Sequence, residues 1–83
     1  MMYSDEVKMI LIDVLSLGEA GERLEAESPL LGSLPELDSM AVVSLIAALE
    51  EHFDIAVDDE DIRASTFETL GSLADFVARK RTA

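Results

Sequence analysis

The sequence predicts an all-α fold, in which three longer helices and one short helix form a bundle with a long loop between the first two. Apolar residues recur at spacings of three and four in separate segments. Helix-capping side chains precede those segments, and no β-type alternation persists anywhere. The 83 residues support a single domain over 1–83. Because cysteine is absent, neither disulfides nor thiolate metal sites reinforce the core.

The first helix is expected over about 4–17, followed by a long loop over 18–38. Ser4 is the expected cap, apolar residues recur from Val7 to Leu15, and Gly18 ends the helix. Structureless loops of this length are uncommon in compact domains, so its leucines are expected to anchor it over the helix ends. These anchors are Leu24, Leu30, Leu31, Leu34 and Leu37. Part of the loop, around 19–27, could form a frayed helical turn.

Three further helices are expected after the loop. The second spans about 39–53, is capped by Asp38, and carries an inward stripe of Val42, Leu45, Ile46, Leu49 and Phe53. The third is short, about 59–63, with Asp58 or Asp59 as its cap and Ile62 as its single core contact. The last spans about 69–81, repeats Leu70, Leu73, Ala74 and Val77, and ends in Arg79-Lys80-Arg81, which complement the helix dipole.

The charge of the chain restricts its partners. Eighteen acidic residues and six basic ones leave a formal charge of −12. Such a surface repels nucleic acid and anionic lipid, and it attracts basic patches on other proteins. The apolar stretch Val7–Leu17 contains Lys8 and Asp13 and is too short to span a bilayer. We therefore expect a cytoplasmic monomer that binds no nucleic acid and does not insert into membranes.

One stretch of the sequence carries a family resemblance. Leu37-Asp38-Ser39-Met40, followed by an apolar helix that ends in Leu-Glu-Glu-His-Phe, closely resembles the signature of the acyl carrier proteins. The segments 55–62 and 69–77 resemble the third and last helices of that family, so the resemblance covers nearly the whole chain. It implies a four-helix carrier with no catalytic activity of its own.

The resemblance also implies a cofactor and partners. In this family a phosphopantetheinyl transferase moves 4′-phosphopantetheine from coenzyme A onto the serine at the position of Ser39. The thiol of this arm holds acyl groups as thioesters for fatty acid or polyketide biosynthesis. The implied partners are that transferase and acyl-activating, acyltransferase or synthase enzymes with basic patches.

Ser39 and Asp38 suit this role physically. Ser39 falls at the first helical position, where a phosphodiester would face unsatisfied N–H groups and the positive end of the helix dipole. Asp38 is expected to cap the helix, and the resemblance adds a contact to the transferase or its metal ion. The simpler interpretation is that the two residues form only an N-terminal capping pair.

Catalysis and metal binding are not expected. A nucleophilic Ser39 would need a nearby base, and His52, the sole histidine, lies thirteen residues along the same helix, roughly 20 Å away. His52 is expected instead to offset Glu50, Glu51 and the helix C-terminus. The acidic run 58–61 lacks the ligand spacing of an EF-hand, so we expect a solvated helix start there.

Partner contacts are expected on the outer face of the second helix. Met40, Val43 and Ala47 lie off the inward stripe, and acidic steering is expected from Glu36, Asp38, Glu50 and Glu51. The alternatives are that the three apolar residues are scattered surface residues or contacts to the long loop. Fatty-acid-synthesis members of the family usually carry acidic residues where this chain has Ala41 and Ser44. This departure favours a specialised pathway, and the run 30–40 resembles specialised carriers, including those near bacterial exosortase and exopolysaccharide loci.

The cargo is defined only in outline. The bundle can open between the second and third helices to admit a short acyl chain. Ala47, Ala48 and Ala56 are small residues that either leave room for it or only allow close packing of the helices. Three alternatives stay open: a peptidyl or aminoacyl carrier, an acidic interaction module without an arm, and a regulator phosphorylated on Ser39.

Overall fold

The computed structural model describes residues 3–82 and confirms the all-α class. Residues 1, 2 and 83 of the expected domain lie outside the described part. The elements in chain order are α1 (Ser4–Leu15), α2 (Glu19–Glu22), α3 (Ser39–Phe53), the 3₁₀ turn η1 (Asp59–Asp61) and α4 (Leu70–Thr82). Within residues 3–82 the only extended pairing is one isolated bridge between Pro29 and Thr69.

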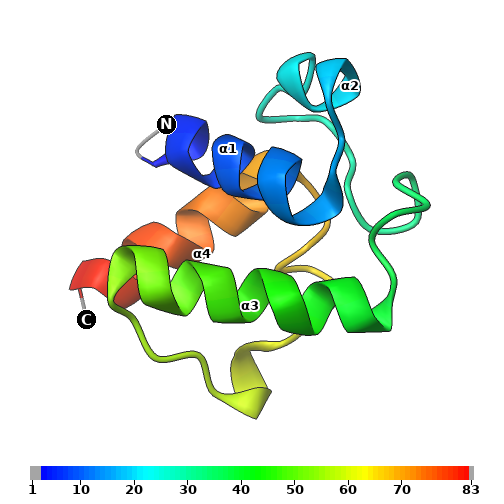
Figure 1. Cartoon of the computed structure of the whole chain (residues 1–83). Helices are drawn as coiled ribbons and strands as arrows, with labels where there is room; N and C mark the ends of the chain where they lie inside the picture. Colours follow the sequence, from blue (N-terminus) through cyan, green and yellow to red (C-terminus); the bar gives the residue numbers. More distant parts are fainter. Residues whose placement is uncertain (1–2, 83) are drawn as a thin grey trace.

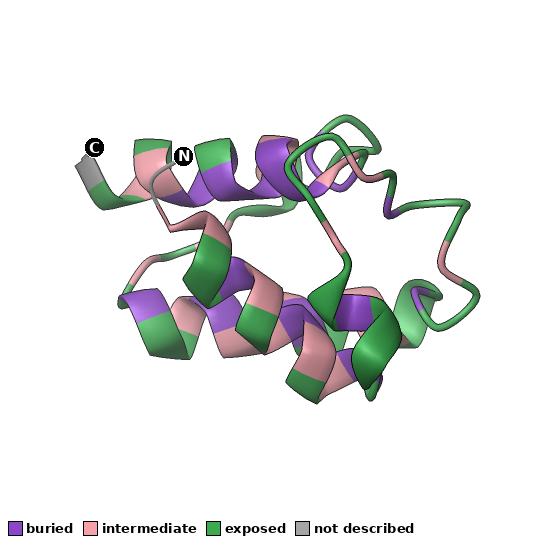
Figure 2. Cartoon of the chain, turned by 90° about the horizontal axis from the view of Figure 1, so that it is seen from above, coloured by how far each residue is buried: buried purple, intermediate pink, exposed green. Residues whose placement is uncertain are grey.

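Three long helices enclose the core. α1 packs against α2, α3 and α4, and α3 also contacts α4. Figure 1 shows the connection after α2 running along one side of the molecule to the start of α3. The stripes predicted on the long helices face inward, as the buried bands in Figure 2 show. Buried stripe residues are Val7, Leu11 and Leu15 of α1, Leu45, Leu49 and Phe53 of α3, and Leu70, Leu73, Ala74 and Val77 of α4; Phe76, outside the predicted stripe, is also buried.

α1 differs at both ends from the sequence-based prediction. Ser4 is the first helical residue, and the capping position is held by Tyr3, which makes no side-chain capping hydrogen bond. The helix ends at Leu15 instead of 17, because Ser16 adopts a left-handed backbone (φ 54°). The next residue, Leu17, is buried, and its N–H donates to the carbonyl of Ile12 at 3.1 Å. Gly18, also at positive φ, then turns the chain into α2.

The long loop is held by backbone pairing as well as by leucines. The N–H groups of Leu30 and Leu31 donate to the carbonyls of Glu68 and Phe67 at 2.8 and 3.0 Å. Leu30 and Leu37 are buried and Leu24 and Leu34 are partly buried. Leu31 was expected to be an anchor but is 42% exposed. Its backbone, not its side chain, fixes this part of the loop.

The short third helix is only one 3₁₀ turn. It ends at Asp61, and Ile62, the expected core contact, is 41% exposed. Ile55 and Val57, which precede the turn, pack against the core instead. Asp58 holds the capping position, and its N–H donates to the carboxylate of Asp61 at 3.0 Å.

The basic end of α4 binds other elements of the fold. Nη1 of Arg81 donates to the carbonyl of Phe53, the last residue of α3, at 2.6 Å. Nζ of Lys80 lies 2.6 Å from Oδ2 of Asp61 and 3.9 Å from that of Asp58. These side chains therefore tie α4 to the end of α3 and to η1, besides balancing the dipole of their own helix.

The pair Asp61–Lys80 makes stability depend on pH. The hydrogen bond from Lys80 holds the pKa of Asp61 below its ordinary value of 3.8. Because the pKa of Asp61 is lower in the folded protein than in the unfolded chain, the pair stabilises the fold at pH values above the unfolded-state pKa. This contribution disappears as the pH falls through the folded-state pKa. Lys80→Gln should therefore destabilise the protein more at about pH 6 than at about pH 2, measured by urea unfolding. Lys8→Gln is the control for charge, and an equal loss at both pH values in Lys80→Gln would contradict the assignment.

Candidate functional site

The start of α3 places Asp38 and Ser39 as the sequence predicts. Asp38 has an extended backbone, and its Oδ1 accepts a hydrogen bond from the N–H of Ala41 at 2.8 Å. Its carbonyl accepts from the N–H of Val42 at 2.9 Å, which begins the helical ladder. Ser39 is therefore the first residue of the helix, and it is exposed. A capped helix start with an open hydroxyl is the local geometry of the site.

Buried leucines fix this helix start from both sides. Leu37, directly before Asp38, is 6% exposed, and its N–H donates to the carbonyl of Leu34 at 3.0 Å. On the helical side, Leu45 is fully buried. Because Leu37 and Leu45 are both buried, Ser39 lies between two points of the chain that are anchored in the core.

The surroundings of Ser39 fit a covalently attached phosphate. The N–H groups of Ser39 and Met40 belong to the first turn, which has no intrahelical acceptors, and the positive end of the helix dipole lies there. The nearby side chains of Glu36 and Asp38 are acidic and exposed. Backbone N–H groups of this chain, and not these side chains, would therefore hold a phosphate attached to Ser39.

The expected partner residues divide into two groups. Met40 and Val43 are 79% and 68% exposed, and Ala47 is exposed one turn further along the same face. Glu36 and Glu51 are also exposed. Glu50 differs, because its carboxylate is partly buried and accepts a hydrogen bond from the N–H of Val57 at 2.9 Å. Glu50 therefore fixes the chain after α3.

His52 has a different partner from the one expected. Its Nε2 lies 3.1 Å from Oε2 of Glu6 on α1, and its ring packs edge-on against Phe53. The expectation that His52 offsets Glu50 and Glu51 missed this contact, since Glu6 is 46 residues away in the sequence. Ser39 and His52 occupy opposite ends of α3. No group of residues within 3–82 has the arrangement of a metal site.

The alanines expected to leave room for cargo lie elsewhere. Ala47 and Ala56 are exposed, and Ala48 lines a hollow between α1 and α3 together with Ile10 and Val14. A second hollow, between η1 and α4, has a volume of about 410 Å³ and is lined mainly by polar side chains, among them Asp61, Thr66 and Lys80. None of the three alanines lines this second hollow, and entry of an acyl chain between the second and third helices stays a prediction.

Comparisons with known proteins agree on one family. The family profile described as "Phosphopantetheine attachment site" matches residues 5–77. An acyl carrier protein of Clostridium perfringens is 36% identical over 73 residues, which cover 88% of this chain and 90% of the relative. That of Syntrophobacter fumaroxidans is 35% identical over 78 residues, covering 94% and 93%. The solution structure of a holo acyl carrier protein from Nitrosomonas europaea is 59% identical, covers both chains completely and superposes with a TM-score of 0.93.

The chain therefore belongs to the acyl carrier protein family. It carries acyl groups on a covalently attached 4′-phosphopantetheine, whose thiol supplies the thioester linkage, and it has no catalytic activity of its own. Members of this family interact with phosphopantetheinyl transferases, acyltransferases and synthases. Within residues 3–82, no helix combines the length and apolar character needed to cross a membrane.

The contribution of Asp38 as a cap can be measured separately from its charge. Asp38→Ala should lower the free energy of unfolding by about 0.5–2 kcal/mol, because the N–H of Ala41 loses its acceptor. Asp38→Asn should retain nearly all of the stability, since asparagine caps about as well. Urea unfolding of both variants checks this, and equal losses would show that Asp38 stabilises the fold through its charge.

Proposed function

We propose that Ser39 is the residue that carries the 4′-phosphopantetheine arm. The observation that supports this most directly is an exposed hydroxyl at the first position of α3, directly after the capping Asp38. A transferase can reach this hydroxyl without unfolding the protein, and the attached phosphate meets the positive end of the helix dipole. Neither the helix nor its cap needs to change when the arm is added.

The experiment is arm transfer to purified protein. The chain is incubated with coenzyme A and a broad-specificity phosphopantetheinyl transferase, and its intact mass is measured. Wild type and Ser44→Ala should each gain one phosphopantetheine group, while Ser39→Ala should gain none. Ser44 is a matched control, because it is exposed on the same helix. Transfer to a folded Ser39→Ala variant would refute the assignment.

We further propose that Met40, Val43 and Ala47 form the partner surface, with acidic steering from Glu36, Asp38 and Glu51. The apolar members are exposed beside Ser39, where a partner that reaches the arm must approach. Basic patches on the transferase and on acyl-transferring enzymes complement the acidic residues.

This surface predicts an effect on arm transfer. Met40→Asp should lower kcat/KM of the transferase for this protein by about tenfold. In the complex, the substitution replaces an apolar contact that the transferase buries with a charge that loses its water. Met9→Asp is the control, since Met9 on α1 is 70% exposed and Met40 is 79% exposed. Steady-state transfer kinetics measure both, and equal rates for the two variants would place the transferase contact elsewhere.

We infer that the chain serves a specialised pathway in the cytoplasm, as a monomer, instead of general fatty acid synthesis. Ala41 and Ser44 occupy positions of α3 where fatty-acid-synthesis carriers usually have acidic residues. The part of the partner surface that lies between its acidic ends is therefore more apolar in this chain. Mass spectrometry of the acyl group on protein purified from its own cells tests this inference. Ordinary saturated fatty acyl intermediates alone would contradict it.

A further inference from the structure

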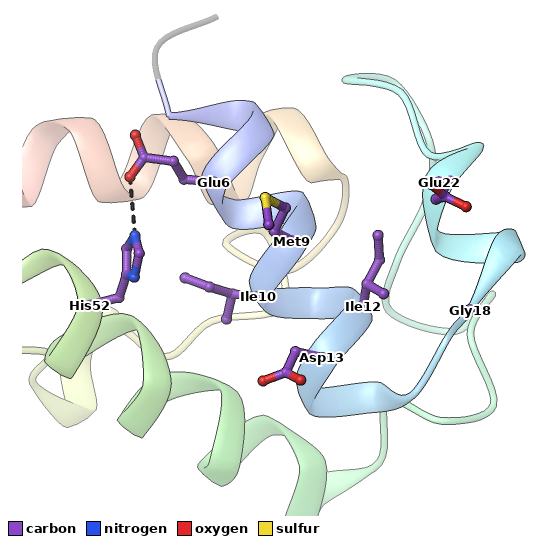
Figure 3. A pocket seen from close by; sticks show the side chains of 8 residues that line it. All are labelled: Glu6, Met9, Ile10, Ile12, Asp13, Gly18, Glu22 and His52. Atoms are coloured by element: carbon purple, nitrogen blue, oxygen red, sulfur yellow. Dashed lines mark hydrogen bonds and ion pairs between the residues drawn. The ribbon is translucent and has the colours of Figure 1, made fainter.

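A groove lies on the side of the molecule formed by α1, α2 and the last turn of α3. Its volume is about 730 Å³, and it is open to solvent. Figure 3 shows the paired side chains of Glu6 and His52 at one end and Gly18 and Glu22 at the other. Met9, Ile10 and Ile12 of α1 lie between these ends. The first α-helix thus forms the floor of the groove.

The floor of the groove is apolar. Met9 is 70% exposed, whereas Ile10 and Ile12 are partly buried against the core. A smaller hollow of about 480 Å³ adjoins the groove, because both are lined by Ile10, Asp13 and His52. Its other lining residues include Val14 and Ala48. The larger groove therefore gives an apolar strip along α1. The adjoining hollow continues it beside the end of α3, but the exposed lining of this hollow is mostly polar.

The rim of the strip is acidic. Glu6, Asp13 and Glu22 line the groove, and Glu51 lines the adjoining hollow. Among the described residues, neither hollow is lined by a lysine or an arginine, and His52 is already in contact with Glu6. An apolar floor with a rim of one sign complements a surface that is apolar in its centre and basic at its edges.

The wall formed by α2 is held close to α1. Gly21 is buried, and a Cβ at this position would overlap Cγ1 of Ile12. Its N–H donates to the carbonyl of Gly18 at 3.1 Å. Because the glycine allows this close approach, the groove is already formed in the protein alone.

We propose that this groove is a second docking surface, which binds an amphipathic helix of a partner protein with aliphatic residues on one face and lysine or arginine beside them. Such a helix places its apolar face on Met9, Ile10 and Ile12 and its cations on the acidic rim. The acidic rim repels the other candidate ligands, which are anionic membranes, nucleic acids and free fatty acids.

The groove lies far enough from Ser39 for two partners to bind the carrier at the same time. Its nearest residue on α3 is His52, thirteen residues and roughly 20 Å along the helix from Ser39. A partner helix bound there leaves Ser39 and the apolar residues Met40, Val43 and Ala47 free, while Glu51, which lines the adjoining hollow, is shared by the two surfaces. The carrier can then stay attached to one protein while another acts on the arm, which raises the effective concentration of the thioester.

The test uses isotope-labelled holo protein and a defined probe. The probe is a synthetic helical peptide with leucines at positions i, i+3, i+4 and i+7 and lysines elsewhere, titrated while amide NMR signals are followed. Asp13→Lys/Glu22→Lys alters the rim. Asp59→Lys/Glu60→Lys changes the net charge equally at η1, away from the groove. Met9→Glu alters the floor, and thermal melting confirms that each variant is folded.

The proposal expects the largest shifts at Met9, Ile10, Ile12 and Gly18. Affinity should fall by about tenfold or more in Asp13→Lys/Glu22→Lys and in Met9→Glu, and by less than about threefold in the η1 variant. Equal weakening by both double variants would show non-specific attraction to an acidic protein and overturn the proposal. Shifts centred on Met40 and Val43, or the absence of binding, would also overturn it. Arm transfer to Ser39 is measured on the same samples, so a failure of the groove is distinguishable from a failure of the site.

Discussion

Leu45→Ala is expected to lower the free energy of unfolding by about 2–5 kcal/mol. Leu45 is completely buried in the middle of α3, in the core that this helix shares with α1 and α4. Truncation removes apolar contacts and leaves a cavity that the surrounding helices cannot fully close. A domain of this size is only marginally stable, with about 5–10 kcal/mol in total, so the variant should be close to unfolding.

Urea unfolding followed by circular dichroism measures this loss, and Val43→Ala is the matched control on the same helix. Val43 is 68% exposed, so its truncation should change stability by no more than about 0.5 kcal/mol. The expected difference between the two variants follows from burial alone, because both substitutions leave an alanine in a helix. If the two variants lost the same stability, the packing of α3 described above would be wrong.

Gly21→Ala is expected to destabilise the protein by about 1–3 kcal/mol, although alanine is the better helix former. Helix propensity alone predicts a gain of about 0.8–1 kcal/mol in a helix interior. The added Cβ, however, would overlap the side chain of Ile12 and would lie 2.9 Å from Cβ of Leu17. Since α1 and α2 must separate to accept it, overpacking outweighs propensity.

The sign of the change makes this prediction decisive. A rise in the melting temperature of Gly21→Ala would show that α2 does not pack closely on α1. Glu22→Ala, at the next position of α2, is the control, since Glu22 is exposed and its truncation should cost less than about 0.5 kcal/mol. Gly21→Ala should also disturb the groove, because the added Cβ displaces Ile12, which lines the groove.

Local signals explain which parts of the fold the sequence could predict. The stripes of α3 and α4 follow from apolar spacing, and each side chain of these stripes is buried or packs against the core. The start of α3 was predictable because an aspartate cap acts only on the residues directly after it. The candidate site could therefore be located from sequence, since Ser39 and Asp38 are neighbours in the chain.

Contacts between distant segments explain the errors. The contact of His52 with Glu6 and the hydrogen bond that the N–H of Val57 donates to Glu50 join segments that are brought together only by the path of the chain between the helices. Leu31 and Ile62 have apolar side chains that suit a core, but the backbone turns them outward. The packing of Gly21 on Ile12 has no local signature either, because any short polar segment with a glycine is typical of a loop.

The central claim, that the arm is attached to Ser39, is tested most directly by locating the arm on the holo protein. Cleavage after glutamate releases the peptide 37–50, whose only serines are Ser39 and Ser44. Fragmentation of this peptide in a mass spectrometer should find phosphopantetheine on Ser39, with fragments that begin at Met40 unmodified. An arm on Ser44, or on a serine of any other peptide, would contradict the claim.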